Sequence, residues 1–517
     1  MIKKLIAFLS MLSLTLSFPL ISVNAAVKAG SSCKTLGITS VTSGKTFTCI
    51  KSGNKLVWNK GISTNKALAI DIKKIYSTDS GYYDDINGGP LAPDPRIPEQ
   101  WIEAQKYYEQ NNMQSGQFRI AKYNLGTNRP KALFEPAGDF NKIDACKIRN
   151  DMNRSGLSHH PSSYKVERRH PSPNSVIQLI PIYAEDTAKP KNSPSQDYSK
   201  YLEFIKDWID YSSDFGSNAQ IKIPNEYIKF PNKIEPYKLY HPVNWDTPGH
   251  VKFNKDVIAA VDSSIDFSGV HIGIIVAPPG TDASVMQQAA LGSFQTAEGL
   301  VPVASSQVSH LATNMSKSEY SILGHPFWWI HELYHVGYGF DDHYGDPKNL
   351  TGKGEFGMGW WTMMTPWGGD LSVWEKWLLG FVQESQIQCV TNTKTSIHWI
   401  APASVKTQES KAVVIPISLN KVVVVESIRP AGLHYKTPQK VQGALVYEID
   451  LSKNEHGMGM KLSLPTNREM NPNPFSYGFY LGDASLRKDD KTVSNGYEIS
   501  VIESGTFGDV IKVQKLN

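Results

Sequence analysis

The sequence lacks several features that would assign it to a well-marked class of proteins. It has 517 residues but only four cysteines, and its formal net charge is +4. Beyond the N-terminus no apolar run approaches the roughly 20 residues of a membrane span, and no G-x-S-x-G motif is present. These absences argue against a membrane-spanning body and the simplest serine hydrolase. The small net charge gives no reason to expect nucleic acid as a partner.

The N-terminus has the features of a secretory signal peptide. Two lysines precede an apolar run over residues 5–21, and residues 23–25 (V-N-A) fit the small-x-small cleavage pattern. We therefore expect residues 1–25 to be removed and the protein to be secreted, either free outside the cell or associated with its surface. The alternative is an uncleaved anchor helix, which Pro19 disfavours.

An even number of cysteines in an exported chain favours disulfides. Three pairings of the four cysteines are open. We favour a local bond between Cys33 and Cys49, which leaves Cys146 and Cys389 as a long-range pair.

The most informative stretch contains the pentad His-Glu-x-x-His at His331, Glu332 and His335. Residues four apart lie on one face of a helix, so both imidazoles can bind one metal ion from the same side. Glu332 is then placed to act as general base on a metal-bound water, as in zinc peptidases. The alternative is a chance match on an ordinary surface helix.

Residues around the pentad support a helix and offer further ligands. Pro326 suits a first helical turn, and Gly337 and Gly339 supply the positive φ angles that end helices. Catalytic zinc needs a third protein ligand, and three candidates follow the glycines: Asp341, Asp342 and His343. Downstream, Met364, or failing that Met363, is expected to form the methionine turn beneath the metal that marks metzincins.

Apolar runs and turn signals divide the chain into five expected segments. The order of strand, helix, helix and strand over residues 176–183, 201–211, 254–264 and 270–276, followed by the pentad, is that of a zincin. Short apolar runs in the last 130 residues predict a β-sandwich. We thus expect an α+β, zincin or metzincin-like catalytic domain with a mixed sheet and an active-site helix. The segments are 1–25 (signal peptide), 26–61 (disulfide-stapled hairpin module), 62–170 (linker or pro-segment), 171–387 (metallopeptidase domain) and 388–517 (β-sandwich).

Three strings together carry a family resemblance: H-E-L-Y-H…G-F-D-D-H-Y-G, W-W-T-M-M-T and W-E-K-W-L-L-G-F. From about Ser175 to Val382 the chain resembles the immune-inhibitor-A-like metallopeptidases, secreted bacterial zinc endopeptidases of the metzincin type. The resemblance implies Zn²⁺ as cofactor, held by His331 and His335, with Glu332 as base. It also implies protein or peptide substrates.

The family pattern H-E-x-x-H-x-x-G-x-x-D is not matched without a gap. Ungapped counting makes Asp341 the third ligand, whereas one inserted residue aligns Gly339 and Tyr344 with the family and makes Asp342 the ligand. We favour Asp342, and His343 stays a third alternative because many metzincins use histidine there. Tyr344 has two possible roles: a hydrogen bond to the transition state, or packing against neighbouring side chains.

The remaining expectations concern metal, partners and a rival function. The sequence leaves open whether calcium binds as well, and we expect a monomer. The hairpin module resembles one near the N-terminus of secreted actinobacterial proteins, which suggests association with a cell wall or surface. The rival hypothesis is a secreted surface-binding or wall-binding protein whose zincin domain is structural and non-catalytic.

Overall fold

The computed structural model describes much of the chain outside its N-terminal segments. The described residues are 27–36, 39–42, 45–60, 62–63, 129–148, 172–239, 248–282, 284–286, 292–305, 325–343, 345, 357–359, 361–364, 370–429, 433–434, 441–453, 457–470 and 483–516. The expected signal peptide lies outside them. No helix within these ranges is both long enough and apolar enough to cross a membrane. The chain contacts separate into two units, Met1–Ala67 and Leu68–Asn517.

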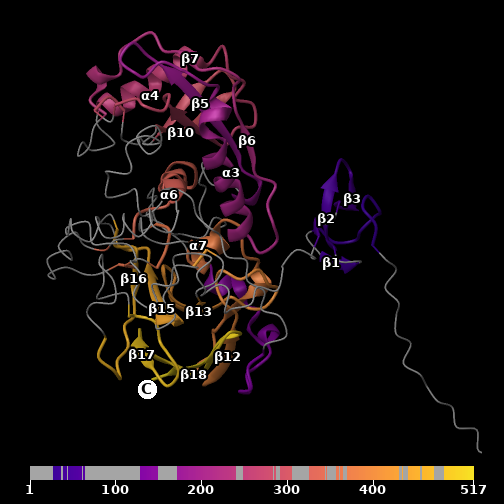
Figure 1. Cartoon of the computed structure of the whole chain (residues 1–517). Coiled ribbons are helices and arrows are strands. Elements are labelled where there is room, and N and C mark those ends of the chain that lie inside the picture. The colour runs from indigo at the N-terminus through magenta and orange to yellow at the C-terminus, as the bar shows by residue number, and fades with distance from the viewer. Residues whose placement is uncertain are drawn as a thin grey trace, which may run out of the picture. The chain divides into compact units, whose positions relative to one another are not determined.

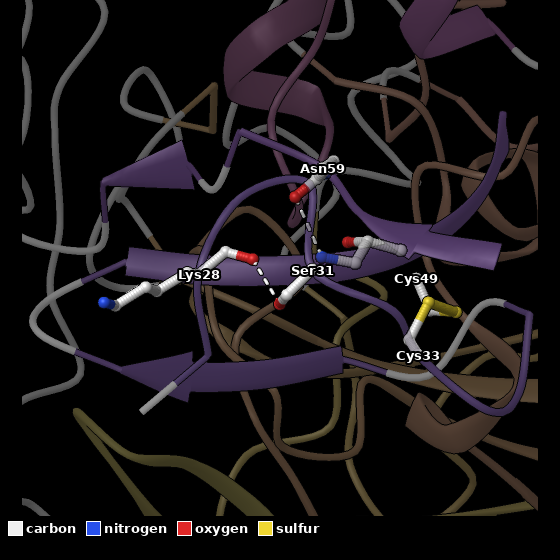
Figure 2. Close-up of a disulfide and its surroundings, with 6 residues drawn as sticks. Lys28, Ser31, Cys33, Cys49 and Asn59 are labelled. Atoms are coloured by element: carbon white, nitrogen blue, oxygen red, sulfur yellow. Dashed lines mark hydrogen bonds between the residues drawn. A yellow bond between two sulfur atoms is a disulfide. The ribbon is translucent and has the colours of Figure 1, made fainter. Parts of the chain in front are cut away.

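The first unit is a small antiparallel sheet held by a disulfide. It contains β1 (Thr39–Thr42), β2 (Lys45–Ser52), β3 (Lys55–Trp58) and β4 (Ile62–Ser63), with β2 paired to all three others. The β2–β3 pair is the hairpin expected from the sequence. Cys33 is bonded to Cys49, and the Asn59 side chain accepts a hydrogen bond from the Thr48 N–H at 3.0 Å (Figure 2).

The second unit begins with a mixed sheet whose strands are parallel except for the last. The order is β6 (Gln220–Lys222), β5 (Val176–Tyr183), β8 (Ile272–Val276), β10 (Gly299–Ser305) and β9 (Ser293–Thr296), and β7 (Ile228–Lys229) also pairs with β5. The expected strands at 176–183 and 270–276 are therefore present. Both faces of β5 are buried, as a parallel sheet covered by helices requires.

Helices cover the two faces of this sheet (Figure 1). Alternate side chains of β5, Ile177 and Leu179, join one buried cluster with α3 (Pro194–Ser212) and α6 (His325–Tyr338). Ile180 and Ile182, on the other face, join a second cluster with α4 (Pro248–Val261). The period-2 pattern of the strand thus places α6, which carries the pentad, against one face of the sheet.

One expectation about α6 is wrong. Gly337 does not end the helix but lies inside it, and a Cβ there would come 2.2 Å from Ile272 Cδ1. The absence of a side chain therefore lets α6 approach β8 closely. Gly339 does follow the helix with a positive φ of 71°, as expected.

The C-terminal part consists of two sheets. One has the order β11 (Ile387–Cys389), β13 (Ala412–Ser418), β14 (Lys421–Ile428), β15 (Gly443–Asp450) and β16 (Met460–Leu462); the other has β12 (Ser396–Ile400), β19 (Gly508–Lys515), β18 (Tyr497–Gly505) and β17 (Lys491–Ser494). Side chains of both sheets share one buried cluster. The molecule is therefore mixed α+β, with several sheets and few helices.

The segment before the first central strand belongs spatially with these C-terminal sheets. Residues 129–148 contain two short 3₁₀ helices, Ala137–Phe140 and Ile143–Cys146. The Glu135 N–H donates to the Ile397 carbonyl at 2.9 Å, and Cys146 is bonded to Cys389. Both disulfides are thus the pairings that the sequence favoured. That residues 62–170 form a pro-segment stays a prediction.

Candidate metal centre

Helix α6 is fixed in rotation by its apolar side chains. Ile330, Leu333 and Tyr334 are buried in the cluster shared with the mixed sheet, and the Tyr334 ring lies 5.4 Å from the ring of Trp208 on α3. Tyr338, one turn later, shares a hydrogen bond with Ser175 just before β5. These contacts fix the rotation of the helix so that His331 and His335 face the loop that follows.

Three ligand atoms meet at this face. The Nε2 atoms of His331 and His335 are 2.9 Å apart, and each lies 3.2 Å from Asp342 Oδ1. Among the described residues, these three form the one group of His, Cys, Asp and Glu side chains suited to hold a metal ion. All three are nearly enclosed: the His331 and Asp342 side chains are 2% and 3% exposed, and that of His335 is 10%.

Hydrogen bonds on the far side of each ring determine which nitrogen faces the centre. The Nδ1 of His331 lies 2.8 Å from the Met363 carbonyl, and the Nδ1 of His335 lies 2.8 Å from the Phe340 carbonyl. A carbonyl oxygen only accepts, so each Nδ1 carries the proton and donates. In a neutral ring Nε2 then presents a lone pair, which is the arrangement in which a second group orients a metal-binding histidine.

The donor set fits a divalent cation such as zinc. Two imidazole lone pairs and a carboxylate oxygen repel one another unless a positive charge lies between them. Tetrahedral bonds of about 2.0–2.1 Å would separate ligand atoms by roughly 3.3 Å, close to the observed 2.9–3.2 Å. In the protein alone, burial lowers the pKa of His335, but the Asp342 carboxylate outweighs it and raises that pKa to about 9. A cation, whether a proton or a metal ion, is therefore favoured here.

Glu332 is enclosed beside the three ligand atoms without joining them. Glu332 is only 6% exposed. Burial raises the pKa of its carboxyl, whereas the two neighbouring imidazoles oppose that rise. A carboxyl group in this position can exchange a proton with a molecule held at the centre.

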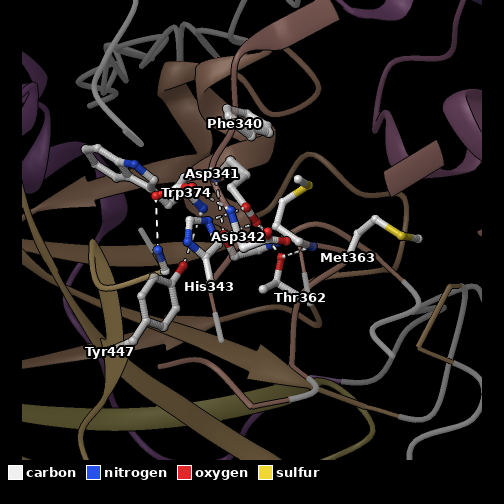
Figure 3. Close-up of polar contacts among 12 residues, drawn as sticks. Phe340, Asp341, Asp342, His343, Thr362, Met363, Trp374 and Tyr447 are labelled. Carbon is white, nitrogen blue, oxygen red and sulfur yellow. Dashed lines mark hydrogen bonds and ion pairs between the residues drawn. The ribbon is translucent and has the colours of Figure 1, made fainter. Parts of the chain in front are cut away.

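The structure distinguishes the three candidates for the third ligand (Figure 3). Asp342 faces the imidazoles. Asp341 instead accepts hydrogen bonds from the N–H groups of Asp342, at 3.0 Å, and Gly457, at 3.2 Å. His343 points to Glu375, with Nε2 and Oε1 3.0 Å apart. Tyr344 lies outside the described residues.

Both candidate methionines are fully buried, and their backbone carbonyls contact residues of the centre. The Met363 carbonyl accepts from His331, and the Met364 carbonyl accepts from the His343 N–H at 3.0 Å. The two residues therefore hold His331 and the loop that carries Asp342 and His343. That one of the two sulfurs lies beneath a bound metal stays a prediction, with Met364 preferred on sequence.

A buried hydrogen-bond network that contacts His343 was not predicted from the sequence. The Glu375 carboxylate, in α7 (Val373–Leu378), accepts from His343 at 3.0 Å, from Thr362 Oγ1 at 2.6 Å and from Ser372 Oγ at 2.7 Å. Burial favours its neutral form, but these hydrogen bonds outweigh burial and lower the pKa of Glu375. The capping-box pattern S-x-x-E at Ser372 was the available signal.

The network continues into the C-terminal sheet. Glu426 of β14 accepts from the Val373 N–H at 2.6 Å and from Tyr447 Oη at 2.9 Å. Burial raises the pKa of Glu426 to about 7. The start of α7, and through it the ligand loop, is thus attached to the C-terminal strands (Figure 3).

Comparison with known proteins gives no assignment, since no family model matches the chain and no curated protein matches it.

Proposed function

We propose that the protein is a secreted, zinc-dependent endopeptidase related to the immune-inhibitor-A-like metallopeptidases. The observation that carries the proposal is the convergence of His331 Nε2, His335 Nε2 and Asp342 Oδ1, with Glu332 enclosed beside them. The parallel strands followed by α6 and a buried methionine turn support a zincin fold of metzincin type. The two C-terminal sheets with a shared core support a β-sandwich.

The proposed reaction is hydrolysis of a peptide bond. Zinc held by the two histidines and Asp342 would polarise the scissile carbonyl and lower the pKa of water to about 7. Glu332 takes a proton from the attacking water and passes it to the leaving amine. The hydrogen bonds to the Met363 and Phe340 carbonyls keep both imidazoles in the tautomer that can bind metal.

The test compares the purified wild-type chain with a Glu332→Gln variant. We expect about one zinc per chain in both proteins by elemental analysis, and cleavage of casein by the wild type alone. Loss of the general base should lower the rate at least about 100-fold. A chelator should abolish wild-type cleavage and added zinc should restore it. His331→Ala is the matched metal-binding control and should lose zinc.

Two outcomes would overturn the proposal. Full-rate cleavage by a zinc-loaded Glu332→Gln protein would exclude this mechanism. A wild-type protein that binds zinc but cleaves no protein or peptide would favour the rival, a surface-binding protein with a structural metal, or a zinc hydrolase acting on other amides or esters. The enclosed Glu332 favours the enzyme, because a structural site needs no base.

A further inference from the structure

The first unit differs sharply in charge from the rest of the chain. Residues 27–63 contain six lysines and no arginine, aspartate or glutamate. Two more lysines lie in the expected signal peptide, so residues 64–517 have 45 basic and 49 acidic residues. Such asymmetry within one chain indicates a partner for the basic part rather than a general property of the protein.

The basic side chains of this unit are available to a partner. Lys28, Lys34, Lys51, Lys55 and Lys60 are all exposed. None of the five forms an ion pair with any residue that the structure describes. The Lys28 side chain extends away from the disulfide (Figure 2). Lys51 and Lys55 flank the β2–β3 turn, where Ser52 is the register partner of Lys55.

We propose that the first unit is a binding module for an anionic lipid bilayer. A set of lysines without arginine provides mobile point charges, which suits many dispersed phosphate groups better than one planar carboxylate. The same unit exposes two large apolar side chains, Leu36 at 62% and Ile50 at 41%. Exposed apolar groups in a small basic unit favour a bilayer over a soluble polyanion, because they can enter the headgroup region.

The experiment measures sedimentation of the chain from Ala26 onward with lipid vesicles, so that the apolar N-terminus does not contribute. The vesicles contain either phosphatidylcholine alone or 30% phosphatidylglycerol. We expect binding to the anionic vesicles only, and weaker binding in 0.5 M salt. The triple variant Lys34→Gln, Lys51→Gln, Lys55→Gln should bind about 100-fold more weakly, since each lysine near an anionic surface contributes about fivefold.

Matched controls distinguish the effect of the first-unit lysines from the effect of the protein's overall charge. Lys191→Gln, Lys229→Gln, Lys394→Gln removes three exposed lysines of the second unit and should leave binding unchanged. Leu36→Ser with Ile50→Ser should weaken binding to vesicles but not to soluble polyphosphate. Absence of vesicle binding, equal loss in both lysine triples, or tighter binding to polyphosphate than to vesicles would overturn the proposal. Zinc content and casein cleavage should stay unchanged in every variant, so failure here is distinct from failure of the enzyme hypothesis.

Discussion

The two units of the protein use charged side chains in opposite ways. In the first unit five lysines, at positions 28, 34, 51, 55 and 60, are exposed and lie outside ion pairs with described residues. The described core of this unit contains little more than Phe47 and Cys49. In the second unit several charges are fully buried and paired. Lys376 and Asp370, both 0% exposed, lie 2.7 Å apart, and Lys411 lies 3.1 Å from Asp214. Charge in the first unit faces outward to solvent or a partner, whereas in the second it joins segments internally.

The buried charges of the second unit connect elements that are far apart in sequence. Asp370 also accepts hydrogen bonds from Ser212 at the end of α3 and from Ser404 before β13, each at 2.6 Å. Lys411 donates to the Ala403 carbonyl at 2.9 Å, and burial lowers the pKa of its ammonium to about 8. The region of the metal centre and the C-terminal strands therefore share one polar core.

Breaking a buried pair should have the largest effect. Lys376→Met leaves Asp370 charged and enclosed without its cation, which should lower the unfolding free energy of the second unit by about 3–5 kcal/mol. Lys55→Met in the first unit removes an exposed charge and should change stability by no more than about 0.5 kcal/mol. Denaturant unfolding followed by tryptophan fluorescence compares the two. If both variants lost a similarly small amount of unfolding free energy, the inferred difference between buried, paired charges and exposed charges would be wrong.

Removal of the local disulfide should destabilise the first unit alone. Cys33 and Cys49 are 16 residues apart, and closing a loop of that size stabilises by about 3 kcal/mol. With so small a core, Cys33→Ser with Cys49→Ser should leave β2 and β3 largely unprotected in hydrogen exchange. Exchange in β5 and β14 should stay slow in the same sample. Loss of protection there too would mean that the units depend on each other.

Acid should destabilise the second unit but not the first. Burial lowers the pKa of His398 to about 4 from 6.5, so the folded state excludes a proton that the unfolded state binds. The stability from neutral His398 is complete above pH 6.5 and is lost as pH falls towards 4. Between pH 6.5 and 4.5 this loss is about 2 kcal/mol. His398→Gln should reduce the slope of unfolding free energy against pH. The first unit, without His, Asp or Glu in residues 27–63, should show no such slope.

Local sequence patterns predicted the strands and helices well. They predicted contacts between residues that are distant in the sequence poorly. The apolar run Val176–Tyr183 is a strand from its first to its last residue, because burial on both faces leaves a continuous apolar signal. The spacing of His331 and His335 was sufficient to place both imidazoles together. Choosing between Asp341 and Asp342 required the path of the loop after Gly339, which no short pattern encodes.

The supporting groups of the centre were missed for the same reason. The Met363 and Phe340 carbonyls act through the backbone, which the sequence does not distinguish by residue type. Glu375 reaches His343 across 32 positions, and Glu426 reaches Val373 across 53. Gly337 was misread because a glycine near a helix end has two uses, and only the position of Ile272 shows which applies.

The bond between Cys146 and Cys389, 243 positions apart, makes a covalent ring of everything between them. Every candidate ligand and Glu332 lie within that ring. A single backbone cut anywhere in it yields two pieces that still travel as one molecule, and they come apart only when a reductant is present and the fold opens. Such a nick would therefore leave the residues of the centre covalently joined to each other.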